Sequence, residues 1–243
     1  MTHKTKGIVL RTVKYGETSL IVTIFTELFG VQSYIVNGVR TSSKSNKKGN
    51  CFVAGAILDF IVYHNEQKNL QRIKEFQWAY LFQQNFSDVI KNCIVLYMVE
   101  LLTKCLKQPE QNTDLFNFFE DVLKELDVAD KTVTANMPLY YTLQLPHFLG
   151  FKMIDNYSEK NIYLDLQEGC FESEQPNHNN YLTGEQAFVT SQLLKVLVPH
   201  ELDQIKLSGD ARRNLLLQYQ DFYALHIPDF GQLKTLTVLH EVL

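Results

Sequence analysis

Apolar and polar residues alternate with a period of two through roughly the first 76 residues of this 243-residue chain. Five short segments rich in β-branched and aromatic residues carry the pattern, at 7–14, 19–26, 30–37, 56–64 and 70–76. Such alternation is typical of strands that bury one face. Short connections join all of them except the third and fourth. Because five short strands must hide their edges, we expect a small closed Greek-key barrel.

After Trp78 the apolar residues recur every three or four positions, which is typical of amphipathic helices. We expect helices from about Trp78 to Lys107, over 113–126, 132–149, 184–198 and 211–227, and in the last eleven residues. Asn112 or Thr113, Thr183 with Gln186, and Ser208 are the predicted N-terminal caps. Residues 155–178 lose the pattern and predict a β-hairpin. The fold class is therefore α+β, with a barrel domain at 1–78 and a helical domain at 79–243 that has a small β-hairpin insertion near 155–178.

The net charge of −4 is unevenly distributed. Residues 1–48 have a net charge of +6, and residues 49–243 have a net charge of −10. The excess is concentrated in NGVRTSSKSNKKGN (37–50), which we call the cationic segment. It contains Arg40, Lys44, Lys47 and Lys48 and no acidic residue. A one-signed segment between two strands is either a solvated loop or a surface that binds phosphates, and we expect it to contact nucleic acid.

Other residues extend this hypothesis. Arg11, Lys14 and Lys6 are placed to continue the cationic track over the barrel. Tyr34 and Tyr63 lie on predicted strands, where their rings either stack on bases or cover the barrel. Arg212 and Arg213, with Lys206 nearby, form a second basic spot, which is either a solvated helix face or a contact for DNA or an acidic peptide.

Several classes of protein are disfavoured. The sequence has no GxSxG, GxxxxGK[ST], HExxH or GxGxxG motif, so we expect neither an enzyme nor a cofactor. The cysteines, Cys51, Cys93, Cys105 and Cys170, form no CxxC pair, so neither a metal site nor a disulfide framework is indicated. No apolar run is long enough to span a membrane, and the N-terminus lacks the features of a signal peptide. We expect a cytoplasmic protein.

Several segments resemble one known family. VKYGETSLIVTIFTELFG (13–30), the following NGVR (37–40), LPHFLGF (145–151) and the terminal LKTLTVLHEVL are similar to segments of the RecO family of bacterial recombinational repair. The resemblance implies an OB-fold barrel followed by a helical domain. Many members have a four-cysteine zinc finger after the LGF segment, where this chain has only Cys170. We therefore expect no zinc there and interpret the hairpin as a metal-free replacement.

The resemblance also implies a function without catalysis. Such a protein binds single- and double-stranded DNA through the cationic segment and helps complementary strands to anneal. With RecR it loads RecA onto strands covered by single-stranded-DNA-binding protein, whose acidic C-terminal tail contacts the helical domain. It works in the cytoplasm at the nucleoid. Two alternatives remain open from the residues: an RNA-binding OB-fold module, and a protein-interaction scaffold that does not touch nucleic acid.

Overall fold

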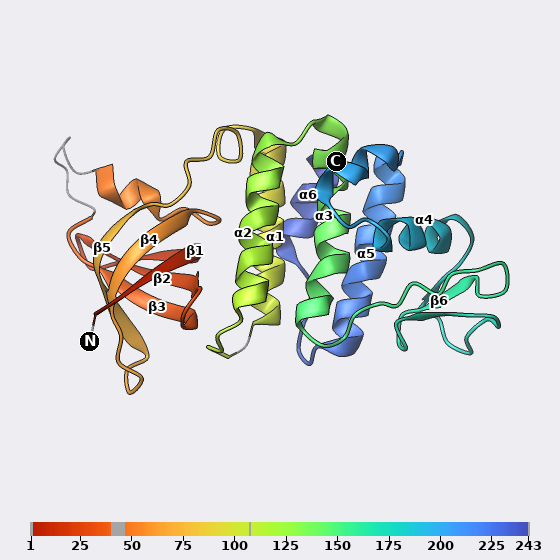
Figure 1. Cartoon of the computed structure of the whole chain (residues 1–243), viewed down its shortest axis with the longest axis horizontal. Helices are drawn as coiled ribbons and strands as arrows, with labels where there is room; N and C mark the ends of the chain where they lie inside the picture. Colours follow the sequence, from red (N-terminus) through yellow and green to blue (C-terminus); the bar gives the residue numbers. More distant parts are fainter. Residues whose placement is uncertain (1, 40–46, 107, 243) are drawn as a thin grey trace. The chain divides into compact units, whose positions relative to one another are not determined.

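The computed structural model describes residues 2–39, 47–106 and 108–242, and the side chains of Lys47 and Lys48 are outside that description. The chain forms two compact units. Unit 1 comprises Met1–Gln83 and Leu106–Lys124, and unit 2 comprises Gln84–Cys105 and Glu125–Leu243. The predicted architecture, a five-stranded barrel and a helical region with a small β insertion, is confirmed (Figure 1). The domain boundary after residue 78 stays a prediction, because a compact unit need not fold on its own.

Unit 1 is built on a closed barrel with the strand order β1-β2-β3-β5-β4. The strands are β1 (Thr2–Tyr15), β2 (Ser19–Thr26), β3 (Gly30–Val36), β4 (Ile57–Tyr63) and β5 (Leu70–Trp78). β3 and β5 pair in parallel, and the other neighbours are antiparallel. A short 3₁₀ helix, η1 (Lys47–Cys51), lies between β3 and β4. This is the Greek-key order of an OB-fold, and barrel closure pairs the strand edges.

A bulge between Val9 and Arg11 reverses the side-chain alternation in the middle of β1. Val9, before the bulge, and Thr12, after it, both pair with buried residues of β2. The period-two alternation predicted for residues 7–14 is therefore interrupted, because one inserted residue shifts the pattern by one position. The bulge also marks the point where β1 stops pairing with β4 and continues with β2 alone.

The second segment of unit 1, which includes α2 (Thr113–Val128) as far as residue 124, packs on the barrel. The Phe116 ring lies 5.5 Å from the ring of Phe25 on β2. At Gly30, where φ is 61°, an added Cβ would lie 2.2 Å from the carbonyl oxygen of Glu110. Only glycine permits this approach of two backbones. One side of the barrel is thus covered within unit 1.

Unit 2 consists of a bundle of helices with a small sheet at its edge. Its helices are α1 (Val89–Cys105), α3 (Lys131–Gln144), η2 (Leu145–Phe148), α4 (Gly184–Leu194), η3 (Pro199–Gln204), α5 (Gly209–His226) and α6 (Lys234–Val242). The sheet has the order β7-β6-β8, with β6 (Tyr163–Asp165), β7 (Cys170–Glu172) and β8 (Tyr181–Leu182). The predicted hairpin is confirmed as β6 and β7, and β8 was not predicted. Among the described residues, no helix has the length and apolar character needed to cross a membrane.

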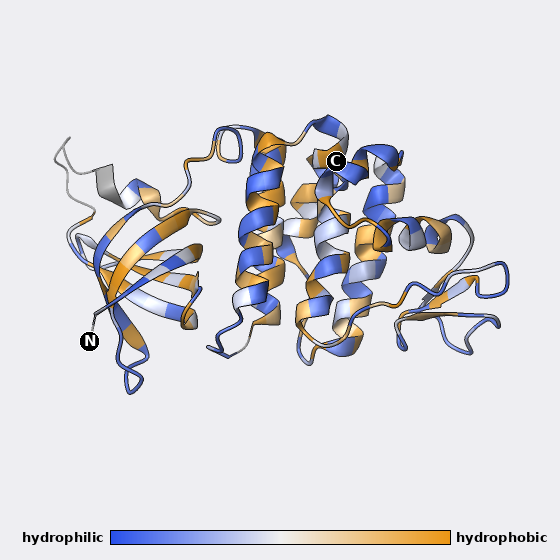
Figure 2. Cartoon of the chain, viewed as in Figure 1, coloured by the Kyte–Doolittle hydropathy of each residue, from blue (hydrophilic) through white to orange (hydrophobic). Residues whose placement is uncertain are grey.

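Helix α3 is the centre of unit 2, with ten of its fourteen residues buried. It packs against α1, α4, α5 and η3. The buried Tyr97 hydroxyl lies 2.7 Å from the Thr142 hydroxyl, and the Tyr223 hydroxyl donates to the Thr142 carbonyl at 2.8 Å. These bonds satisfy polar groups in an otherwise apolar interior. Figure 2 shows the corresponding hydrophobic residues within the strands and helices.

One predicted helix start and one predicted capping box are wrong. Helix α1 begins at Val89 and not after Trp78, because the Asp88 carboxylate accepts the backbone N–H of Lys91 at 2.9 Å and caps the helix there. Helix α4 has no capping box, because its N-cap residue, Thr183, makes no side-chain capping bond.

Candidate nucleic-acid interface

Both ends of the cationic segment meet the hairpin that joins β1 and β2. Near the start of the segment, the Val39 N–H donates to the Thr18 carbonyl at 3.0 Å. After it, the Phe52 carbonyl accepts from the Thr12 hydroxyl at 2.7 Å. A Cβ on Gly49 would lie 2.7 Å from the Val39 carbonyl oxygen, so the two ends also touch each other. The segment therefore leaves and re-enters the barrel at one place.

Arg11 and Lys14 lie at this same place, on the distal part of β1, and both are exposed. Lys14 shares a strand face with Thr12, whose hydroxyl fastens the end of the segment. The structure thus brings these two predicted site residues to the base of the cationic segment. The four cations of the cationic segment are described less fully. The structure does not describe Arg40 and Lys44, and it describes only the backbone of Lys47 and Lys48.

The outer face of the barrel carries a row of side chains that crosses all five strands, which we call the outer row. Strand by strand it consists of Val13, Ile21, Ile35, Arg72 and Tyr63. The inward neighbours of these residues in β2 and β3 are buried, so the row faces away from the barrel core. OB-folds bind oligonucleotides on this type of surface and on the adjoining β1–β2 and β4–β5 loops.

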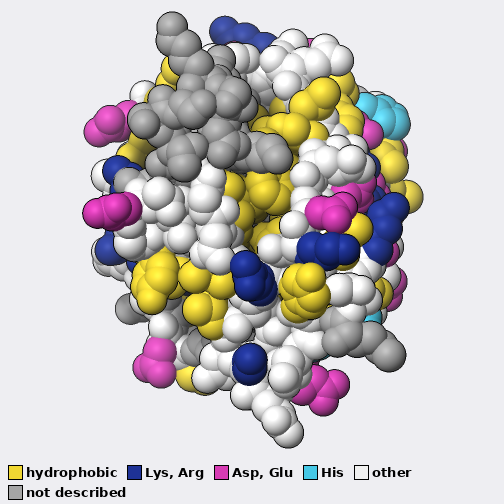
Figure 3. Space-filling model, turned by 90° about the vertical axis from the view of Figure 1, so that its left-hand side faces the viewer, with side chains coloured by type: hydrophobic (Ala, Val, Ile, Leu, Met, Phe, Trp, Pro, Cys, Tyr) yellow, Lys and Arg dark blue, Asp and Glu magenta, His cyan; other side chains and the backbone are white. Residues whose placement is uncertain are grey.

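Arg72 was missed from the sequence as a site residue, and so was Lys74 two positions later. The signal was present in LQRIKEF, where the two cations flank Ile73, and both are exposed, although the register of β4 and β5 shifts at Lys74. Arg11 projects from the same outer face, since it pairs with Thr23 of β2. Figure 3 shows Lys and Arg side chains interspersed with hydrophobic ones on the barrel side of the molecule.

Lys6 is not available to extend the track as predicted. Its ammonium lies 2.9 Å from both carboxylate oxygens of Glu120, a nearly buried residue of α2 that also pairs with Lys124. Burial alone would raise the pKa of Glu120, but the hydrogen bonds from Lys124 and Lys6 outweigh it, so the pKa is lowered. Lys6 therefore fixes the helix to the barrel.

The predicted stacking role of Tyr34 is corrected by its burial. Its side chain is 0% exposed, and its ring stacks on Phe60 inside the barrel, with ring centroids 6.5 Å apart. A ring enclosed in this way cannot lie against a base. Tyr63, in contrast, is 45% exposed at the end of the outer row, where β4 leads into the β4–β5 loop.

Arg212 and Arg213 lie near the N-terminus of α5 and are held within unit 2. An Arg212 Nη1–H donates to the Leu207 carbonyl at 2.7 Å. Arg213 pairs with Asp210 and donates to the His240 carbonyl. Lys206 donates to the Asp203 carbonyl at 2.6 Å. Both arginines thus have structural partners, and a contact with DNA stays a prediction.

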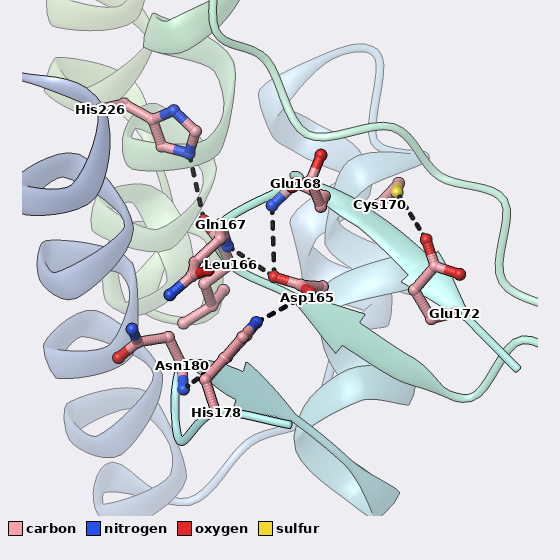
Figure 4. Close-up of polar contacts among 9 residues, drawn as sticks. All are labelled: Asp165, Leu166, Gln167, Glu168, Cys170, Glu172, His178, Asn180 and His226. Carbon is pink, nitrogen blue, oxygen red and sulfur yellow. Dashed lines mark hydrogen bonds and ion pairs between the residues drawn. The ribbon is translucent and has the colours of Figure 1, made fainter. Parts of the chain in front are cut away.

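The sheet insertion of unit 2 is organised by one carboxylate, Asp165 (Figure 4). Its Oδ1 accepts the backbone N–H groups of Gln167 at 2.7 Å and Glu168 at 3.2 Å. Its Oδ2 lies 3.1 Å from Nε2 of His178, whose Nδ1 accepts the Asn180 N–H. The imidazole must therefore donate through Nε2. One side chain joins the β6–β7 turn to the segment that leads into β8.

These residues do not fit the four-thiolate zinc site of the similar family. Cys170 is the only cysteine after position 105. Burial and the neighbouring Glu172 raise the pKa of its thiol to about 11, so it is protonated at neutral pH, whereas zinc binds thiolates. Across residues 2–39, 47–106 and 108–242, no group of three or more His, Cys, Asp or Glu side chains could hold a metal ion.

Comparison with known proteins gives one consistent result. Residues 1–82 match the family described as "Recombination protein O N terminal", and residues 87–236 match "Recombination protein O C terminal". The chain is 34% identical over 246 residues to the DNA repair protein RecO of Flavobacterium psychrophilum, and 32% identical over 243 residues to that of Phocaeicola vulgatus. The DNA repair protein RecO of Azobacteroides pseudotrichonymphae is 27% identical over 242 residues. Each alignment covers 100% of this chain and 99% of the relative.

Proposed function

The chain belongs to the RecO family of DNA repair proteins, and from that premise we propose that it acts as a non-catalytic recombination mediator. It binds single- and double-stranded DNA, promotes strand annealing and, with RecR, loads RecA onto strands covered by single-stranded-DNA-binding protein. The observation that supports the proposal is that both ends of the cationic segment are bonded to the same part of the barrel. The described residues on either side of positions 40–46 are bonded to the β1–β2 hairpin and to β1, where Arg11 and Lys14 are exposed, and the sequence of the segment supplies four further cations.

The proposed mechanism is electrostatic. Two bare strands repel each other, and a cationic surface that neutralises both phosphate backbones leaves the bases free to pair. Lys and Arg side chains suit this task because phosphate contacts carry no sequence information. About five phosphate contacts give a log–log salt slope near −3.5 for single strands, or roughly a hundredfold loss of affinity between ~50 and ~200 mM salt.

Protein partners belong to the same proposal. RecR, the acidic tail of single-stranded-DNA-binding protein and, indirectly, RecA are the partners that family membership suggests. Unit 2 is the better candidate for the tail, since it has helical surfaces and lies outside the cation-rich N-terminal residues. No residue of the chain is assigned to any of these contacts.

The test is annealing of complementary oligonucleotides by the purified protein. The test variant replaces four residues by Ala together, Arg40, Lys44, Lys47 and Lys48. The control variant removes the same charge from exposed positions of unit 2, Lys131, Lys152, Lys160 and Lys234. We expect the test variant to lose annealing, DNA affinity and most of the salt slope, and the control to retain all three.

An unchanged affinity and salt slope in the test variant would refute the role of the cationic segment. Equal-length RNA strands are included as a separate probe, because a small barrel with basic residues can serve either nucleic acid. Annealing of RNA alone would replace the DNA proposal by the RNA-binding alternative.

A further inference from the structure

A hollow lies at the Tyr63 end of the outer row, beside the β4–β5 loop (residues 64–69). Its lining includes His3, Phe29, Tyr63, His64, Lys68 and Arg72. The volume, about 750 Å³, lies within the range of small-ligand pockets, about 300–1,000 Å³. All of these residues belong to unit 1. In Figure 1 the β4–β5 hairpin extends from the barrel near the N-terminus. We call this hollow the β4–β5 pocket.

One wall of the pocket is formed by three rings, those of His3, Phe29 and His64. The imidazole of His64 lies parallel to the Phe29 ring, with centroids 3.9 Å apart, and His3 meets the Phe29 ring edge-on at 5.4 Å. Burial and then the neighbouring His3 lower the pKa of His64. Its Nδ1 is also buried with no hydrogen-bond partner among the described residues, so protonation there would bury an unpaired N–H. The His64 ring is therefore uncharged at neutral pH.

The loop that forms the rim is already fixed by one buried amide. Gln71, only 3% exposed, donates through Nε2 to the carbonyls of Asn65 and Lys68 and accepts the Asn65 N–H through Oε1 at 2.9 Å. The Asn65 carboxamide in turn accepts the Gln67 N–H. A loop held by its own hydrogen bonds loses little further freedom when a ligand binds.

The mouth combines cations with exposed apolar surface. Arg72 and Lys68 are exposed there, and Glu66 is the acidic residue in the lining. Tyr63 is 45% exposed and Leu70 is 40% exposed, so a ring and an aliphatic side chain face solvent beside the cations. A planar, uncharged group attached to a phosphate matches this combination.

We propose that the β4–β5 pocket binds one unpaired nucleobase of a single strand, stacked on Tyr63, while Arg72 and Lys68 hold the flanking phosphates. This inference rests on the proposed function and specifies the form of DNA that the site selects. A base within a duplex has both faces covered by its neighbours and cannot enter. The pocket thus discriminates in favour of single strands, whereas the cationic segment attracts any phosphate backbone.

The experiment measures the affinity of each protein variant for each of three DNA probes of equal length at one salt concentration. The probes are an oligothymidine, an abasic strand that has phosphates without bases, and a hairpin duplex. Tyr63→Ala is compared with Tyr63→Phe, which keeps the ring, and with Tyr163→Ala in unit 2. We expect Tyr63→Ala to weaken binding of oligothymidine about 5- to 150-fold, the effect of losing one stacked base. Binding of the abasic and duplex probes should not change, and Tyr63→Phe and Tyr163→Ala should behave as the unmodified protein.

The charge contribution is tested with the same probes over a range of salt concentrations. Arg72→Ala should weaken all three probes and reduce the salt slope, and should do so more strongly than Lys74→Ala, whose side chain lies outside the pocket lining and 3.6 Å from Glu75. The pocket proposal is overturned if Tyr63→Ala leaves oligothymidine binding unchanged or weakens all probes equally. Failure of the unmodified protein to bind any probe would instead refute the proposed function.

Discussion

Glu120 shows how one buried carboxylate is kept ionised. It is 5% exposed and accepts hydrogen bonds from two ammonium groups, those of Lys6 and Lys124. These bonds outweigh the effect of burial, so the pKa in the folded protein lies below the ordinary value of 4.5. A lowered carboxyl pKa contributes stability that is fully present above 4.5 and is lost as the pH falls through the folded value.

We therefore expect Glu120→Gln to lower the free energy of unfolding by about 2–4 kcal/mol at pH 7, because two ammonium groups lose their partner. The difference from the unmodified protein should shrink as the pH falls below about 4.5. Denaturant titrations from pH 7 to pH 3 measure both effects. Asp121→Asn, at the exposed neighbouring position, should change stability by no more than about 0.5 kcal/mol. A difference that is constant across this pH range would contradict the assignment.

The two tyrosines show what alternation can and cannot predict at the residue scale. Strand β3 reads GVQSYIV, and both of its faces contain apolar residues, so the pattern did not reveal that Tyr34 points inward and Ile35 outward. For Tyr63, the position at the strand end already favoured exposure. The role of Lys6 was equally hidden, since its partner, Glu120, lies 114 positions away in the sequence.

At the scale of elements, strands were easier to predict than helix starts. The barrel strands differ from their predicted ranges mainly at the ends, because period two and short turns are local signals. The segment before α1 was predicted as helix because Phe82 and Phe86 are spaced for one. The carboxylate of Asp127 instead accepts the N–H groups of Gln84 at 2.8 Å and Asn85 at 2.9 Å, a contact too distant in sequence to be predicted.

Two predicted N-terminal caps, Ser208 and Thr183, test whether the sequence pattern or the observed capping bond determines helix stability. The Ser208 hydroxyl accepts the Ala211 N–H at 3.1 Å, as predicted, whereas Thr183 makes no side-chain capping bond. We expect Ser208→Ala to lower the free energy of unfolding by about 1 kcal/mol, and Thr183→Ala to change it by no more than a few tenths. Equilibrium unfolding of the two variants in urea compares them within one unit. Equal losses would mean that sequence pattern, and not the observed bond, decides the cap energy.

At the scale of the whole molecule, both compact units are assembled from segments separated in sequence. Residues 106–124 join the barrel unit, where the Phe116 ring meets the Phe25 ring, although their helical pattern resembles that of the segments in unit 2. An amphipathic helix shows that one face is covered but not what covers it. Domain order and fold class were therefore predictable from sequence, and this grouping was not. The charge asymmetry was also plain in the sequence, yet it did not show that Arg72 joins Arg11 on one outer face.

The insertion in unit 2 leads to a last prediction for the molecule as a whole. If the hydrogen bonds of Asp165 hold the insertion together in place of a zinc site, the stability of the protein should not depend on metal. We expect the same thermal unfolding curve with and without EDTA, and no zinc in the purified protein by elemental analysis.

Asp165→Asn should lower the free energy of unfolding by about 1–3 kcal/mol in both buffers, because two backbone N–H groups and His178 lose a charged acceptor. Glu172→Gln, at an exposed position of the same sheet, is the control. Destabilisation by EDTA, or an unchanged Asp165→Asn variant, would show that something other than this carboxylate holds the insertion together.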